Sequence, residues 1–190
     1  MTVVAIADAM RGFAAASLLA RGNARGIELL DLSVEGFWRS FQAVLWIVPL
    51  HALVMLALTH TAADAEIPIP WTAEYISLLA RFALFPLVAL LLTRILGLTQ
   101  RYVPLITACN WAAVLQSAFL AISLLLISLL PEPDRPMLQF FAFAATLVYS
   151  WFVMRAALAT TGLIAFGFVL ADMVSSLWLD QLLDRLLQLG

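Results

Sequence analysis

The sequence contains few charged residues and few chemically reactive side chains. Only 12% of its 190 residues are charged, 64% are hydrophobic, and all ten basic residues are arginine. An average soluble domain has about 25% charged and about 45–50% apolar residues. A soluble fold needs more polar side chains than this to cover its surface, so the composition excludes an ordinary soluble domain.

The same shortages exclude several kinds of site. Cys109 is the only cysteine, so the chain can form no internal disulfide and no cysteine-based metal cluster. Two histidines, His51 and His60, are too few for a histidine-rich metal site, and we expect neither a metal nor a cofactor. The net charge of −2 gives no basic field that would attract nucleic acid. The sequence carries no nucleotide-binding or hydrolase signature, so we expect no enzyme.

Long apolar runs dominate the sequence instead. A helix of about 20 apolar residues crosses about 30 Å of hydrocarbon. We therefore predict an all-α integral membrane protein, with a bundle of five transmembrane helices in residues 37–180. An N-terminal segment with an amphipathic helix, residues 1–36, precedes the bundle, and a short tail, residues 181–190, follows it. The predicted spans are residues 41–59, 75–93, 103–130, 137–154 and 161–179.

Two features set the later span boundaries. Three prolines between residues 131 and 136 cannot continue a helix, so they predict a loop between the third and fourth spans. Residues 137–179 form a nearly unbroken apolar stretch that is too long for one ordinary span. We place a turn between Arg155 and Gly162. A four-span chain with one long broken helix is the alternative.

The residue pattern of the N-terminal segment predicts an amphipathic helix. Asp8 and Arg11 interrupt its apolar run, so residues 1–25 do not form a signal peptide. Four large apolar residues recur at helical spacing: Val3, Ile6, Met10 and Phe13. We predict an amphipathic helix that lies either on the membrane surface or against the bundle, with these residues as its apolar face.

A second short amphipathic stretch follows this helix. Its apolar residues are Ile27, Leu30 and Val34, and its acidic residues are Glu28, Asp31 and Glu35. The acidic residues share one helical face at spacings of three and four. This face is either simply solvated or a docking surface for a basic partner.

The arginines predict the orientation of the spans. Alternating five spans across the membrane places seven arginines on the N-terminal side: Arg11, Arg21, Arg25, Arg39, Arg94, Arg101 and Arg155. Only Arg135 and Arg185 fall on the other side. Basic residues near span ends are concentrated in the cytoplasm. The pattern therefore predicts a cytoplasmic N-terminus and a C-terminus on the opposite side, which requires an odd number of spans.

Two charged residues fall inside the predicted spans at similar depth, Arg81 in the second and Asp172 in the fifth. A charge in the bilayer is costly, so we predict that these two side chains form an intramembrane pair. The pair is either a strut between two spans or part of a substrate or proton site. A third possibility is that Arg81 only extends toward the headgroups.

Other polar residues in the spans are candidates for the same site. They are His51 in the first span and Asn110, Gln116 and Ser117 in the third. Small residues also recur every three or four positions in the third and fifth spans, a pattern typical of close helix packing. We therefore expect these two spans to pack together, and the polar residues to be either packing contacts or a polar pathway.

Two segments resemble a known family. The first is Glu35-Gly36-Phe37-Trp38-Arg39-Ser40-Phe41, which leads into a span with Pro49. The second is Tyr102-Val103-Pro104 followed by Asn110-Trp111. Through these two segments the chain resembles bacterial members of the Yip1 family of small membrane proteins. The resemblance extends over about residues 30–180. The resemblance implies five spans in a bacterial inner membrane, with a cytoplasmic N-terminus and a periplasmic C-terminus. The long N-terminal region of the eukaryotic members is missing, so their role in vesicle traffic does not carry over.

Two functions fit these observations. The first is a non-catalytic scaffold or accessory subunit of a membrane complex, whose partners are the lipid bilayer and other membrane subunits or further copies of itself. The second is a small membrane transporter or channel. Convergence of the intramembrane polar side chains on a water-accessible cavity would favour the second function, and a dry Arg81–Asp172 pair would favour the first.

Overall fold

A computed structural model describes residues 3–61 and 71–188 of the chain, and all regular structure in those ranges is helical. The long elements are α1 (Val3–Ala20), α2 (Val34–Ser40), α3 (Val44–Thr61), α4 (Trp71–Ile95), α5 (Tyr102–Ser128), α6 (Arg135–Leu158) and α7 (Gly162–Gln188). Short 3₁₀ turns connect some of them: η1 (Ala24–Leu29), η2 (Phe41–Ala43), η3 (Thr99–Arg101) and η4 (Glu132–Asp134).

Five helical stretches are long and apolar enough to cross a membrane. They are Val34–Leu58, Trp71–Ile95, Thr99–Ser128, Glu132–Leu158 and Gly162–Leu183. The fold is therefore that of a polytopic membrane protein, and the prediction of five spans is confirmed. The turn that separates the last two spans lies where the sequence places it, with Ala159 in the left-handed conformation directly after α6.

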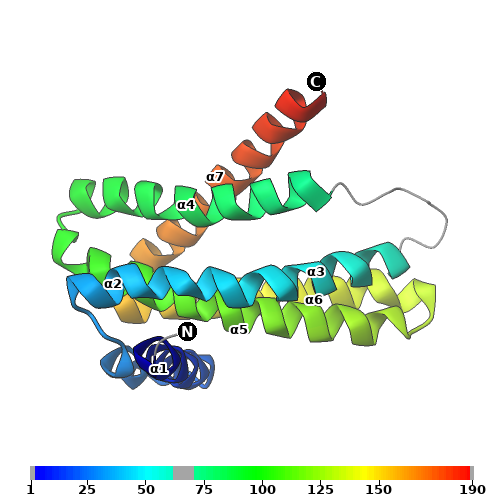
Figure 1. Cartoon of the computed structure of the whole chain (residues 1–190). Helices are drawn as coiled ribbons and strands as arrows, with labels where there is room; N and C mark the ends of the chain where they lie inside the picture. The colour runs from blue at the N-terminus through cyan, green and yellow to red at the C-terminus, as the bar shows by residue number, and fades with distance from the viewer. Residues whose placement is uncertain (1–2, 62–70, 189–190) are drawn as a thin grey trace.

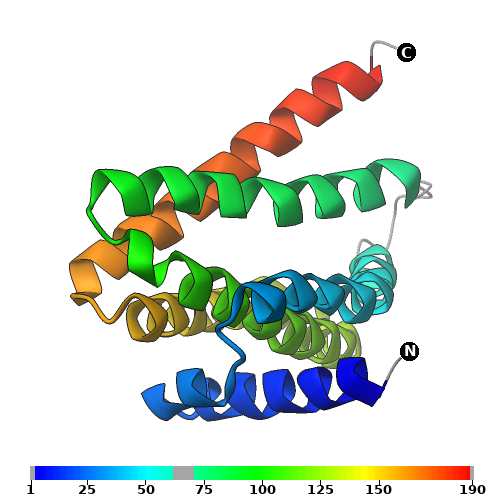
Figure 2. The same cartoon turned by 60° about the vertical axis from the view of Figure 1, so that its left-hand side comes forward.

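The spans form two layers (Figure 1). In the first layer α5 lies between α3 and α6, and in the second layer α4 packs against α7. Figure 2 shows the two layers from another side, with α7 running obliquely past α4. The expectation that the third and fifth spans pack together is wrong, because α7 packs mainly on α4 and α6. A side-chain carbon added to Gly167 of α7 would meet nothing within 4 Å, so this small residue serves no close approach.

Helix α1 lies across the first layer, seen nearly end-on in Figure 1 and from the side in Figure 2. Its packed face consists of small residues and one leucine: Ala9, Gly12, Ala15, Ala16 and Leu19. A side-chain carbon on Gly12 would lie 2.1 Å from the ring of Trp111, so only glycine fits against this indole. The contact fixes α1 against α5.

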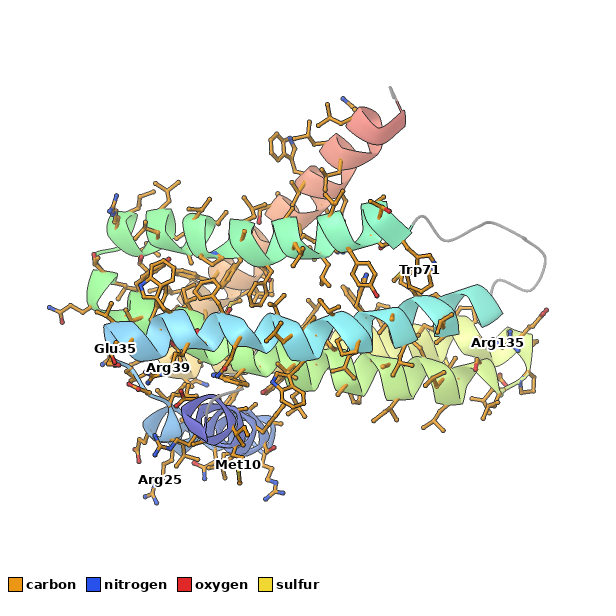
Figure 3. The ribbon with its side chains drawn as sticks, in the orientation of Figure 1. Met10, Arg25, Glu35, Arg39, Trp71 and Arg135 are labelled. Atoms are coloured by element: carbon orange, nitrogen blue, oxygen red, sulfur yellow. The ribbon has the colours of Figure 1, made fainter. Side chains whose placement is uncertain are left out.

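Only part of the predicted apolar face of α1 packs on the bundle. Phe13 packs edge-on against Trp46 and Trp111, with ring centroids 5.4 and 5.7 Å apart. Ile6 and Met10, two of the predicted apolar-face residues, are 52% and 69% exposed. Asp8 faces the protein instead, where its carboxylate lies 2.6 Å from Arg39 Nε. Gly12 leaves room for the indole of Trp111 and Phe13 packs edge-on against the same ring, whereas Met10 faces outward in Figure 3.

Arg39 of α2 joins the N-terminal elements through three acidic side chains. Its guanidinium lies 2.6 Å from Asp8, 2.5 Å from Asp31 and 3.6 Å from Glu35. Hydrogen bonds from Ser33, followed by the charge of Arg39, hold the pKa of Asp31 below its usual value. Asp31 of the predicted acidic face therefore binds Arg39, whereas Glu28 is exposed and the Glu35 side chain is 86% exposed, so these two carboxylates remain solvated.

The arginines at the helix ends segregate as the sequence suggests. Figure 3 shows Arg25 and Arg39 at one end of the bundle and Arg135 at the other. Arg135 also provides hydrogen bonds for carbonyl groups at the C-terminal end of α5. Its guanidinium donates to the carbonyls of Leu130 and Ser128 at 2.9 and 3.2 Å. Those carbonyls have no partner within the helix, so the arginine acts as a side-chain cap for α5.

Candidate functional site

A cavity of about 140 Å³ lies where the two layers of the bundle meet. Four helices contribute to its wall: α4, α5, α6 and α7. The lining residues are Arg81, Phe82, Phe85, Cys109, Asn110, Ala112, Ala113, Gln116, Ser150, Val153, Met154 and Asp172. One water needs about 10–15 Å³ of such space, so the cavity has room for several waters or for a small solute.

Four of the predicted site residues line this cavity. They are Arg81 of α4, Asn110 and Gln116 of α5, and Asp172 of α7. The structure thus brings together side chains that are up to 91 positions apart in the sequence. The other two predicted residues, His51 and Ser117, are not part of the cavity wall.

The direct partner of Arg81 differs from the predicted one. Arg81 Nη1 lies 3.5 Å from a carboxylate oxygen of Asp180, and no ion pair joins Arg81 to Asp172 among the described residues. Ser77, one turn away on α4, donates to the other oxygen of Asp180 at 2.6 Å. Two residues of α4 therefore hold one carboxylate of α7, and they connect the helices of the second layer.

The tilt of α7 explains this difference. The prediction compared residue depths as if the spans ran parallel, but α7 crosses α4 obliquely (Figures 1 and 2). Each residue of a tilted helix advances less than 1.5 Å along the membrane normal. The helix also continues to Gln188, past the span end predicted at residue 179. Asp180 was therefore assigned to the tail, and only the structure identifies it as the partner of Arg81.

Asp172 faces the cavity without an ion pair in the described part of the chain. Its backbone carbonyl accepts a hydrogen bond from Ser175, but that contact does not involve the carboxylate. An unpaired carboxylate inside a membrane needs a proton, a cation or a polar ligand to offset the loss of water. Asp172 is the residue of the cavity best suited to bind one of these.

Both amide side chains in the cavity are fixed by hydrogen bonds. Asn110 donates to the Ser40 hydroxyl at 2.8 Å, and that hydroxyl donates to the Phe37 carbonyl at 2.7 Å. Gln116 donates to the Ser150 hydroxyl at 2.6 Å and to the Thr146 carbonyl at 3.0 Å. With the amide nitrogens engaged, the two amide oxygens are acceptors that the described side chains leave available to a ligand.

His51 lies at a second polar contact between the layers. Its Nε2 atom is 3.6 Å from a carboxylate oxygen of Glu74, and its ring packs edge-on against Tyr75 with ring centroids 6.0 Å apart. The contact joins α3 to the first turn of α4. Within the described ranges, no group of three or more histidine, cysteine, aspartate or glutamate side chains could hold a metal ion.

The two segments that resemble the Yip1 family meet in the structure. The hydrogen bond between Asn110 and Ser40 joins them, and the rings of Phe37 and Tyr102 are 5.8 Å apart. The contact fixes the start of the first span beside the start of the third. One side of Asn110 therefore touches this junction while the residue also lines the cavity.

Comparisons with protein-family models, curated proteins and solved structures give no match to this chain. The Yip1 resemblance therefore stays a prediction, and a functional assignment depends on the geometry of the chain itself.

Proposed function

We propose that this chain is a small membrane transporter or channel, and that the cavity between its two helix layers is the polar site. The observation that supports this proposal most strongly is the convergence of Arg81, Asn110, Gln116 and Asp172 on one cavity. Polar side chains inside a membrane are costly, and in transport proteins they face the pathway of the substrate. The amide side chains of Asn110 and Gln116 and the carboxylate of Asp172 likewise line one cavity within the bundle.

The cavity favours a proton, a small cation or a small hydrophilic solute as the transported species. Arg81 is engaged by Asp180, whereas the carboxylate of Asp172 has no such partner among the described residues. Asp172 brings a carboxylate to the cavity wall, and Asn110 and Gln116 bring amide oxygens that no described side chain occupies. This arrangement suits a ligand that carries positive charge or donates hydrogen bonds.

The proposal includes an orientation and a location. The concentration of arginines at one end of the bundle supports a cytoplasmic N-terminus and a periplasmic C-terminus. The resemblance to bacterial Yip1 proteins supports a bacterial inner membrane. Fusions of a reporter enzyme to either end of the chain, active only in the periplasm, would test this orientation.

Flux through reconstituted protein tests the function. The purified chain is placed in liposomes that contain a pH-sensitive dye, and a potassium diffusion potential drives proton entry. We expect entry above that of empty liposomes, and we expect Asp172→Asn to abolish it while Glu28→Gln, a matched change at an exposed residue outside the cavity, leaves it unchanged. Rubidium and small amines tested in the same way extend the search to other ions. Absence of flux for all of them would count against a transporter or channel.

One observation favours the scaffold or accessory function as a second candidate. The C-terminal end of α7 extends past α4 in both views (Figures 1 and 2). Val174, Leu177 and Trp178 are 55–62% exposed there, so this part of the helix offers an apolar face to another membrane protein. Affinity purification in a mild detergent would distinguish the two candidate functions. If this chain is an accessory subunit, a second protein should copurify with it in stoichiometric amount.

A further inference from the structure

An open apolar groove of about 320 Å³ runs between α5 and α6 on the face covered at one end by α1. Leu115 and Phe119 of α5 form one side, Ala145 and Tyr149 of α6 form the other, and Ala20 lies at the end of α1. The groove is distinct from the polar cavity, although Gln116 contributes to the walls of both. Its lining suits a hydrocarbon chain, because it is largely aliphatic and aromatic.

The position of α1 sets the direction of the groove. Gly12 packs on Trp111 of α5, and the Tyr149 hydroxyl donates to the Ala16 carbonyl at 2.9 Å, so α1 crosses both spans at this level. Leu115 and Phe119 follow Trp111 by one and two turns, and Ala145 precedes Tyr149 by one turn in the antiparallel helix. The groove therefore begins under α1 and extends about 12 Å toward the far ends of the spans.

Two exposed arginines follow directly at the end of α1. Arg21 comes immediately after Ala20, and Arg25 lies one turn later in η1. Neither forms an ion pair within the described residues, whereas Arg39 nearby is engaged by three carboxylates. Guanidinium groups bind phosphate oxygens through paired hydrogen bonds, so two free arginines favour a phosphate-bearing ligand.

We propose that this groove and the two arginines form a binding site for an anionic phospholipid. One acyl chain lies along α5 and α6 below α1, and the headgroup phosphate is bound by Arg21 and Arg25. Figure 3 shows Arg25 beside α1 at the end of the bundle where Arg39 lies, which is the end at which a headgroup would sit. The ligand is a lipid rather than a soluble phosphate compound, because the groove opens between two membrane spans and supplies the apolar half of the contact.

Native mass spectrometry of the intact protein in detergent tests this site. Phosphatidylglycerol and phosphatidylcholine with the same oleoyl chains are added in equal amounts, and the fraction of lipid-bound protein is measured for each. We expect the wild-type protein to prefer phosphatidylglycerol. Each arginine near an anionic headgroup contributes about fivefold in affinity, so Arg21→Gln with Arg25→Gln should remove most of the preference. The matched control, Arg94→Gln with Arg101→Gln, changes an exposed arginine in the last turn of α4 and another in η3, and should have no effect.

A second variant tests the groove itself. Ala145→Phe fills the space between α5 and α6, and we expect it to lower the binding of both lipids while the unchanged arginines keep their preference for the anionic one. Retention of full phosphatidylglycerol preference by the Arg21/Arg25 double variant would overturn the proposal. Equal loss of preference in the Arg94/Arg101 control would also overturn it, because the effect would then follow total charge. These readouts measure bound lipid and do not depend on transport.

Discussion

The two layers of the bundle are held together in different ways. In the first layer, α5 packs between α3 and α6 through many fully buried residues, and α1 is fixed on it by the contact of Gly12 with Trp111. In the second layer, the contact between α4 and α7 includes a polar clamp of Ser77, Arg81 and Asp180. The cavity lies where the layers meet. The comparison shows that the first layer is held by buried apolar packing, whereas the second layer adds a polar contact between its two helices.

The largest effect on stability is expected at the α1–α5 contact. Gly12→Leu places a branched side chain where even one carbon would lie 2.1 Å from Trp111, so α1 must move off the bundle. Overpacking of this kind costs about 1–3 kcal/mol or more. We expect a lower melting temperature in detergent and faster proteolysis within residues 3–33. Ala14→Leu adds the same kind of bulk on the exposed side of α1 and serves as the control. An unchanged melting temperature in Gly12→Leu would mean that α1 is not fixed by Trp111.

A smaller effect is expected at the clamp in the second layer. Asp180→Asn leaves Arg81 without its ion partner, and both side chains are about one third exposed, so the loss should be about 1–2 kcal/mol rather than that of a fully buried pair. Asp172→Asn should cost less stability, because Arg81 keeps Asp180. Replacing Arg81 and Asp180 together by leucine should recover much of the loss. Greater destabilisation by Asp172→Asn than by Asp180→Asn would instead support a direct Arg81–Asp172 pair.

The junction between the first and third spans should be less sensitive. Asn110→Leu removes the hydrogen bond to Ser40, but the Ser40 hydroxyl keeps its bond to the Phe37 carbonyl. The loss of one such bond costs about 1 kcal/mol. We expect a small decrease in melting temperature, measured against Ser117→Ala as a change on the same helix outside the cavity wall. A decrease as large as that of Gly12→Leu would contradict this ranking.

The smallest effect is expected from the acidic cluster around Arg39. The pKa of Asp31 is held below its ordinary value of 3.8 in the folded protein. A carboxyl group with a lowered pKa stabilises the fold above its unfolded pKa, and that contribution disappears as the pH falls through the folded pKa. Asp31→Asn should therefore lower the melting temperature at pH 7, and the decrease should become smaller as the pH is lowered below 3.8. The same decrease at pH 7 and at the lower pH would show that Asp31 acts by packing rather than by charge.

The number of spans and the turn between the last two could be predicted from the sequence, because hydrophobic length and proline position act locally along one helix. The start of the first span and the end of the last could not, because α2 continues into α3 and α7 extends to Gln188. Arg81 and Asp172 could be recognised in the same way, since a charge in an apolar run stands out without knowledge of its neighbours. Their surroundings could not be predicted. The partnership of Arg81 with Asp180 depends on the tilt of α7, and the packed face of α1 depends on the indole of Trp111, which lies 99 residues after Gly12.

A transport site between the two layers must contain water and be reached by small polar solutes. Cys109 is the only cysteine and lines the cavity, so its labelling by 2-aminoethyl methanethiosulfonate in the folded protein tests this claim directly. We expect the cationic reagent to label Cys109 before denaturation. We expect Asp172→Asn to slow the reaction and Ala113→Phe, which fills the cavity, to block it. Labelling of Cys109 only after denaturation would show a dry interface and would rule out the cavity as a transport site.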